Sequence, residues 1–125
     1  MGSDRTIFPA SDVKIAEWLD NALLTNPNVT EEWVRSALVS LPNHPLLDIA
    51  LAGFETDSKR ADFLRSFGLA RLAKSSIICT RAGEMLLAQD HPKLALTAVD
   101  QALLADPTDI PAQRLRLRVV DAMPR

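Results

Sequence analysis

Apolar residues recur every three or four positions along most of the chain, in segments separated by proline-containing stretches. This spacing places the apolar side chains on one face of an α-helix. Because the intervening stretches are short, we expect successive helices to pack as hairpins. The pattern predicts seven helices, at about residues 11–25, 30–41, 45–55, 58–74, 76–89, 92–105 and from 109 onward.

Residue types at the ends of these segments support their boundaries. Ser11 and Thr30 are candidate N-caps for the first two helices, because a hydroxyl accepts a hydrogen bond from a free backbone N–H of the first turn. Pro42 ends the second helix. The sequence Asp-His-Pro at 90–92 supplies a cap and a first-turn proline for the sixth helix, and a similar signal at 109–111 starts the seventh.

The fourth segment is apolar on nearly all sides. A helix of this kind is expected to be covered by neighbours on several sides. Gly68 lies inside it, where glycine costs up to about 1 kcal/mol relative to alanine. We therefore expect another helix to cross close to the chain at Gly68.

Composition places the whole sequence in one fold class. Its 125 residues include 17 Ala and 19 Leu against 7 Val and 6 Ile, a balance that favours helix over sheet. The length is that of one domain with one modest core. The expected fold is a single all-α domain over residues 1–125, in which residues 1–10 form a flexible N-terminal segment.

Charge and hydropathy exclude several function classes. The chain carries 14 Lys and Arg against 16 Asp and Glu, so it lacks the basic excess typical of proteins that bind nucleic acid. No uncharged apolar run approaches the roughly 18 residues of a membrane-spanning helix, and the polar N-terminus has no signal-peptide core. Cys79 is the single cysteine, in keeping with a reducing compartment. We expect a cytoplasmic protein with no membrane partner.

One segment, from Ser76 to residue 109, has small residues and a proline at fixed places. With Ser76 counted as position 1, Gly83 stands at position 8, Ala95 at 20, Ala102 at 27 and Pro107 at 32. The small residues let two helices approach closely, and the proline ends the second helix. In these positions the segment resembles the tetratricopeptide repeat (TPR), a helical hairpin of about 34 residues.

The match has departures, and it extends loosely upstream. Cys79 and Leu86 occupy positions where the family usually has Trp and Tyr, so aliphatic side chains replace aromatic ones in the hairpin. Upstream, residues 37–38 (Ala-Leu) and Pro42 copy the end of the same unit. Pro42 and Pro107 are 65 residues apart, whereas two full repeats would span about 68. We therefore expect a shortened third helix or turn.

The resemblance implies a right-handed stack of about three TPR-like hairpins closed by a seventh, capping helix. In this family the first helix of each hairpin lines a concave groove that receives a peptide or a protein surface. The implied function is that of a protein-binding adaptor or scaffold. Members include co-chaperones, secretion chaperones and the light chain of kinesin, so the implied partners range from a peptide segment to a cytoskeletal filament or larger assembly.

The groove positions of the clear repeat are largely apolar. They are occupied by Ile77, Thr80, Glu84 and Leu87. This set argues against the clamp of Lys, Asn and Arg with which some members of the family hold a terminal carboxylate.

Continuing the count into the seventh helix brings two arginines to the same groove. Arg114 and Arg118 fall at groove positions 5 and 9. Leu117, Val119 and Val120 are then expected to pack against the sixth helix. The four-residue spacing puts both guanidinium groups on one helical face, where they can pair with a carboxylate of an acidic partner segment. The alternative is a solvated face of a terminal capping helix.

Catalytic and metal-binding motifs are not found. His44 and His91 lie in predicted turns, without a third ligand at metal-binding spacing. Cys79 is expected inside the hairpin as a small apolar group rather than as a nucleophile. Glycine-rich phosphate loops and the G-x-S-x-G, H-E-x-x-H and C-x-x-C motifs are absent. We therefore expect no cofactor, no metal and no enzymatic activity.

A second function stays open: a helical dimerisation or accessory segment of a larger protein, similar to the TPR-like dimerisation region of alkyl sulfatases. A dimerisation segment should expose a contiguous apolar patch, whereas a peptide-binding one should concentrate apolar residues in its groove. An enzyme is the third interpretation, and it requires a pocket with perturbed titratable groups. The sequence leaves the oligomeric state open.

Overall fold

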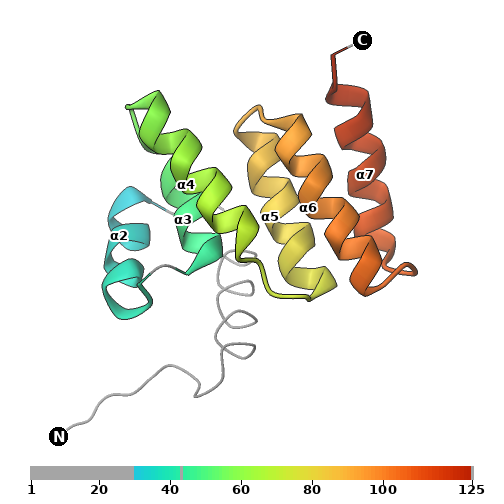
Figure 1. Cartoon of the computed structure of the whole chain (residues 1–125), viewed down its shortest axis with the longest axis horizontal. Coiled ribbons are helices and arrows are strands. Elements are labelled where there is room, and N and C mark those ends of the chain that lie inside the picture. Colours follow the sequence, from blue (N-terminus) through green and yellow to red (C-terminus); the bar gives the residue numbers. More distant parts are fainter. Residues whose placement is uncertain (1–29, 43, 125) are drawn as a thin grey trace, which may run out of the picture.

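The computed structural model describes residues 30–42 and 44–124, which form helices and turns and contain no strand. The all-α prediction is thus confirmed for this part of the chain. No helix in it combines the length and the apolar character needed to cross a bilayer. The predicted helix at 11–25, its Ser11 cap and the segment 1–10 lie outside the described residues. The helices are α2 (Glu31–Ser40), α3 (Pro45–Ala52), α4 (Ser58–Ala70), α5 (Ser76–Ala88), α6 (Pro92–Ala105) and α7 (Ile110–Ala122) (Figure 1).

Local signals at the helix starts account for several boundaries. The Thr30 hydroxyl accepts a hydrogen bond from the N–H of Trp33 at 3.2 Å. The Asp109 carboxylate accepts one from the N–H of Ala112 at 3.1 Å. Both predicted caps are confirmed. α6 begins at Pro92 as expected, but His91 stands at its N-cap and makes no side-chain capping bond.

α3 is shorter than the predicted 45–55 helix, because residues 53–55 continue it with i→i−3 hydrogen bonds at the place where a distant side chain binds one of its carbonyls. The amide of Gln89 donates to the carbonyl of Ile49 at 2.8 Å. The N–H of Gly53, which would bond this carbonyl in a continued α-helix, turns to Ala50 instead at 3.1 Å. α3 therefore has 8 residues where α5 has 13, which confirms the shortened third helix. α4 also ends early, at Ala70 instead of 74.

The helices follow one another in chain order across the molecule, from α2 to α7 (Figure 1). α3 packs against α4, and α5 packs against α6, as two hairpins. α5 also contacts α3 and α7, α6 packs against α7, and α2 contacts α3. One core runs through this array. Its largest fully buried side chains are Val34, Leu46, Leu47, Ile49, Ile78, Cys79, Leu86, Val99, Leu115 and Val119.

Gly68 marks the close crossing that the sequence predicts. A Cβ atom at Gly68 would lie 2.7 Å from the carbonyl oxygen of Pro45 and 2.9 Å from Cγ1 of Ile49, both on α3. Contacts this short do not occur between real side chains and backbone, so the space at this crossing admits only glycine. The absence of a side chain lets α4 lie directly on α3.

The apolar sequence of α4 predicts that neighbours cover this helix on several sides, but part of its apolar surface is exposed. Phe63 is 61% exposed, whereas Arg65 is buried on the face that also contains Leu64 and Leu69. The guanidinium of Arg65 is satisfied there, because it donates to Oε1 of Gln89 at 2.7 Å and pairs with Asp62 at 3.1 Å. A bonded arginine therefore occupies an inner position while an aromatic ring remains outside.

Candidate functional site

The predicted groove residues on α5 have different environments. Ile77 is exposed, and Glu84 and Leu87 are half-buried. The carboxylate of Glu84 lies 2.9 Å from Nη1 of Arg81, so it pairs within its own helix. Ile77 is thus the most accessible of these residues.

Thr80 does not face an open groove. Its side chain is buried, at 7% exposure, and its hydroxyl has no hydrogen-bond partner among the described residues. The physical reason is that α5 contacts three other helices, α3, α6 and α7, which together cover most of its surface. The expectation that Thr80 lines a binding groove is therefore wrong.

Arg114 and Arg118 are both exposed on α7, four residues apart. In residues 30–42 and 44–124, six of the eight arginines form ion pairs with Asp or Glu. Arg114 and Arg118 are the two that do not. Arg116, between them in the sequence, pairs with Asp100 of α6 at 2.9 Å. Two unpaired guanidinium groups on one helical face can together hold a carboxylate.

The apolar residues of α7 divide between two faces. Val119 is fully buried together with Ala112 and Leu115, on the side of α7 that packs against the array. Leu117, by contrast, is 71% exposed, and Val120 is about half exposed, so their predicted packing against α6 is wrong. The reason is the helical repeat: the buried residues occupy one side of α7, and Leu117 points to the other.

The exposed apolar side chains of α7 form a line along the helix. We call Ile110, Leu117 and Val120 the α7 stripe; all three are exposed. Their spacing of seven and three residues places them on one face. Arg114 and Arg118 follow one edge of this face. Gln113 and Asp121, which are exposed and spaced three and four residues from the stripe, lie on the same face. The α7 stripe and the two arginines therefore form a partly apolar surface with a cationic border.

The structure brings only some of the predicted site residues together. Arg114 and Arg118 share a face of α7, and α7 lies against α5, which carries Ile77 and Leu87. No ion pair or hydrogen bond in the described part of the chain connects the two arginines with α5. Glu84 pairs with Arg81 instead.

A groove between α2, α3 and α4 was not predicted. Its volume is about 320 Å³. The rings of Phe63 and Phe67 stack at 5.4 Å, and the guanidinium of Arg71 lies 4.4 Å from the centre of the Phe67 ring. The spacing of 63, 67 and 71, four residues each, is the sequence signal that would have indicated this stack. The groove is lined by Leu38, Pro42, Asp48, Leu51, Arg60, Phe63, Leu64 and Phe67.

Asp48 is the acidic group of this groove. Burial raises the pKa of its carboxyl above the ordinary value, and the nearby charge of Arg71 and a hydrogen bond from Arg71 oppose this rise. The Nη1 atom of Arg71 lies 3.4 Å from Oδ2 of Asp48. Among the described residues that line the groove, Asp48 is the acid–base side chain, and none is a Ser, Thr, Cys or Lys.

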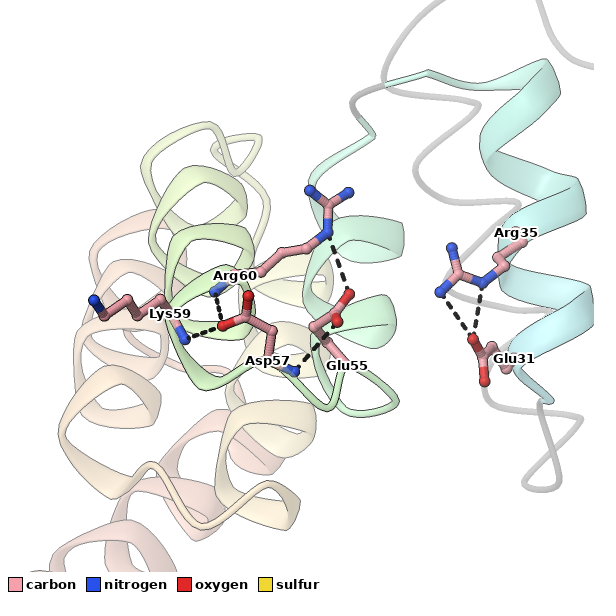
Figure 2. A network of polar contacts seen from close by, with 6 residues as sticks. All are labelled: Glu31, Arg35, Glu55, Asp57, Lys59 and Arg60. Atoms are coloured by element: carbon pink, nitrogen blue, oxygen red, sulfur yellow. Dashed lines mark hydrogen bonds and ion pairs between the residues drawn. The ribbon is translucent and has the colours of Figure 1, made fainter.

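The remaining charges at this end of the molecule form pairs and caps at the start of α4 and along α2. Figure 2 shows Arg60 reaching toward Glu55, with 3.2 Å between Nε and the carboxylate. Asp57 caps α4 by accepting from the N–H groups of Lys59 and Arg60, at 3.0 and 3.4 Å. On α2, Glu31 and Arg35 form a separate pair at 2.8 Å. These charges are used locally, and Arg60, which also lines the groove, is paired with Glu55.

His44 and Cys79 both contribute to the local structure. His44 caps α3 by accepting from the N–H of Leu46 at 3.3 Å. Cys79 is buried as predicted, and its Sγ lies 3.3 Å from the carbonyl of Ala73. Burial raises the pKa of the Cys79 thiol, although a backbone hydrogen bond from Ser75 opposes the rise. No cluster of three metal-ligating side chains occurs in the described ranges.

Comparisons of the chain with models of protein families, with curated proteins and with solved structures gave no match.

Proposed function

We propose that the chain is a TPR-like helical adaptor that binds a segment of another protein, and that it is not an enzyme. The packing of the helices supports this proposal. α3, α5 and α7 contact one another in a row, and α4 and α6 each pack against the helix that precedes them. Hairpin repeats stack in this way and use the exposed surfaces of their helices for binding. The cytoplasm is the proposed location, on the composition given above.

The pair of unpaired arginines on α7 is the observation that carries the proposal. Arg114 and Arg118 have no acidic partner in the described residues, whereas the other six arginines there do. Exposed apolar side chains lie beside them on α7, and Ile77 is exposed on the neighbouring α5. A partner segment with apolar residues and a carboxylate complements this surface. Such a segment can belong to a peptide or to a larger assembly such as a cytoskeletal filament.

The proposal is tested by capture from native cell extract on the immobilised chain. The wild type is compared with the double variant Arg114→Glu and Arg118→Glu, and bound proteins are identified by mass spectrometry. We expect a partner that the wild type retains and the variant loses, and we expect its binding to weaken as salt rises. The melting temperature should stay nearly unchanged, because both side chains are exposed.

A control variant with the same change in charge shows whether the effect is local. Lys59→Glu and Lys93→Glu reverse two exposed cations on α4 and α6. This variant should retain the partner. A partner that binds the arginine variant as well as the wild type, and at high salt, would place the site elsewhere and refute the proposed surface.

A second candidate function, self-association, is favoured by the α7 stripe. Three exposed apolar residues on one helix are the kind of surface through which a dimerisation segment pairs. Light scattering of the free chain distinguishes the two functions. An adaptor is expected to be monomeric, whereas a dimerisation segment is dimeric in the absence of any partner.

A further inference from the structure

α5 and α7 have equivalent faces, one repeat length apart in the sequence, but these faces have different neighbours. A shift of 34 residues, one repeat length, superimposes Gly83 of α5 on Leu117 of α7 and Leu86 on Val120. On α5 this face is covered. Leu86 is fully buried, and a Cβ atom at Gly83 would lie 3.0 Å from Cδ2 of Leu115 on α7 and 3.4 Å from the carbonyl of Ala95 on α6. α6 and α7 together therefore cover this face of α5.

On α7 the matching face is open. α7 packs against α6 and α5 with its opposite side, which contains Leu115 and Val119. Leu117 and Val120 remain exposed, and no helix of residues 30–42 and 44–124 covers them. The face has the length of α7, 13 residues, which is about 20 Å at 1.5 Å per residue. This length accommodates a helix of three turns.

We infer that the α7 stripe docks one acidic amphipathic helix of a partner protein, which covers the open face of α7 as α6 and α7 together cover the matching face of α5. The apolar side of this helix packs on Leu117 and Val120. Its Asp or Glu side chains pair with Arg114 and Arg118. This inference rests on the proposed function, since it specifies what kind of segment the adaptor binds and where.

The charges beside the α7 stripe indicate that the partner helix is acidic. Arg114 and Arg118 line one edge of the α7 stripe and form no ion pair among the described residues, although the exposed Asp121 follows Arg118 by three positions. At the opposite edge Arg116 is already paired with Asp100. A basic helix would meet uncompensated positive charge, whereas an acidic one supplies the missing partners.

Shape restricts the residues of the partner helix. On α5 the glycine at 83 leaves room for the side chain of Leu115 on α7 and for the backbone of α6. On α7 the side chain of Leu117 stands at the same place, so the partner needs small side chains such as alanine opposite it.

A second copy of this chain is a poorer occupant. Pairing α7 with α7 would bring Arg114 and Arg118 of both copies to one interface, where four positive charges repel one another. The proposal therefore commits to a different protein, and self-association is an outcome that the test must detect.

The test uses two synthetic helical probes and the full chain. Both probes keep the buried residues of α6, Ala95, Ala98, Val99 and Ala102, at their spacing. The acidic probe has Glu and Gln at the remaining positions, and the basic probe has Lys and Gln. Binding is measured by the fluorescence anisotropy of labelled probe at low salt. We expect the acidic probe to bind at least about tenfold more tightly than the basic one.

Variants of the chain locate the binding. Leu117→Ser should weaken binding of the acidic probe about tenfold and leave the melting temperature unchanged, since Leu117 is exposed. Arg114→Glu with Arg118→Glu should reverse the preference, so that the basic probe binds more tightly. Leu104→Ser is the matched control, because Leu104 is 84% exposed on α6 and lies outside the α7 stripe. It should leave binding unchanged.

Three outcomes overturn the inference. The first is that the chain binds both probes equally tightly or binds neither probe. The second is binding that Leu117→Ser does not weaken. The third is a dimer of the free chain that Leu117→Ser dissociates, which would make a second copy the occupant. The proposed function fails separately, if captured partners are retained after reversal of the two arginines. Capture that needs the arginines but not Leu117 would refute only the docked helix.

Discussion

Asp48 illustrates how one buried side chain makes stability depend on pH. The unfolded carboxyl titrates near its ordinary value of 3.8, and burial raises the pKa in the folded chain. At pH values between the unfolded and the folded pKa of Asp48, the folded state binds more protons than the unfolded state. The free energy of unfolding therefore falls as pH rises through this window, and the cost persists above the folded pKa.

We predict that Asp48→Asn removes this part of the pH dependence. The variant keeps an oxygen that can accept from Arg71 but carries no charge to desolvate. Relative to the wild type, it should gain stability as pH rises from 3.8 to neutrality. Urea unfolding at a series of pH values measures this. Asp121→Asn, at an exposed position near the end of α7, is the control. If the free energy of unfolding depends on pH in Asp48→Asn as it does in the wild type, then the buried carboxyl of Asp48 is not the cause of this pH dependence.

Gly68 is a residue whose replacement has a defined structural cost. In Gly68→Ala the new methyl group would lie 2.7 Å from the carbonyl of Pro45, which is backbone and cannot rotate away. α4 must then move off α3, and we expect a loss of about 1–3 kcal/mol despite the better helix propensity of alanine. Chemical denaturation measures the loss. Ser66→Ala, at an exposed position of the same helix, should be neutral or slightly stabilising.

The pairing of α5 with α6 depends on small residues at their contact. Ala95 is fully buried, and its carbonyl faces Gly83 of α5. Ala95→Leu should overpack this contact and lower stability by about 1–3 kcal/mol. Thermal unfolding measures the effect, with Ala105→Leu at the exposed end of α6 as the control. An unchanged melting temperature in Ala95→Leu would show that the repeat count is misplaced.

Helix ends differ in how far the sequence could predict them. The starts of α2 and α7 were predictable, because Thr30 and Asp109 cap within their own first turns. The end of α3 was not, because Gln89, 40 residues away, takes the carbonyl of Ile49. No local pattern records which side chain arrives from another hairpin.

Gln89 also connects the two hairpins, α3 with α4 and α5 with α6. Its amide nitrogen donates to Ile49 of α3, and its oxygen accepts from Arg65 of α4. In Gln89→Ala the carbonyl of Ile49 and the guanidinium of Arg65 each lose a part-buried hydrogen bond, although Arg65 keeps its pair with Asp62. A group left unsatisfied costs about 1–3 kcal/mol. We expect faster hydrogen exchange in α3 and α4 than in α5 and α6, since each hairpin can open as a unit.

A second glutamine provides the control for this experiment. The amide of Gln113, on α7, donates to the carbonyl of Pro107 in the preceding turn at 2.8 Å. This hydrogen bond is exposed. Gln113→Ala should leave exchange in α3 and α4 unchanged. Equal loss of protection in all described helices after Gln89→Ala would show that the array unfolds as one unit.

The candidate site was predictable in part. The spacing of Arg114 and Arg118 placed them on one face of α7, which the helix alone ensures. That they lack acidic partners, while Arg116 has one, depends on where Asp100 of α6 lies. Thr80 was misplaced because the number of helices around α5 is a property of the assembled array.

The sequence by itself determined the all-helical class, most helix starts, the close crossing at Gly68 and the burial of Cys79. Each depends on residues within a few positions, where caps, prolines and periodicity act. Only the tertiary structure decided that Arg65 is buried while Phe63 is exposed, and that Leu117 remains uncovered. Burial is the result of contact between distant segments. An apolar residue is therefore buried only when another segment packs over it, and the periodicity of one helix does not specify that segment.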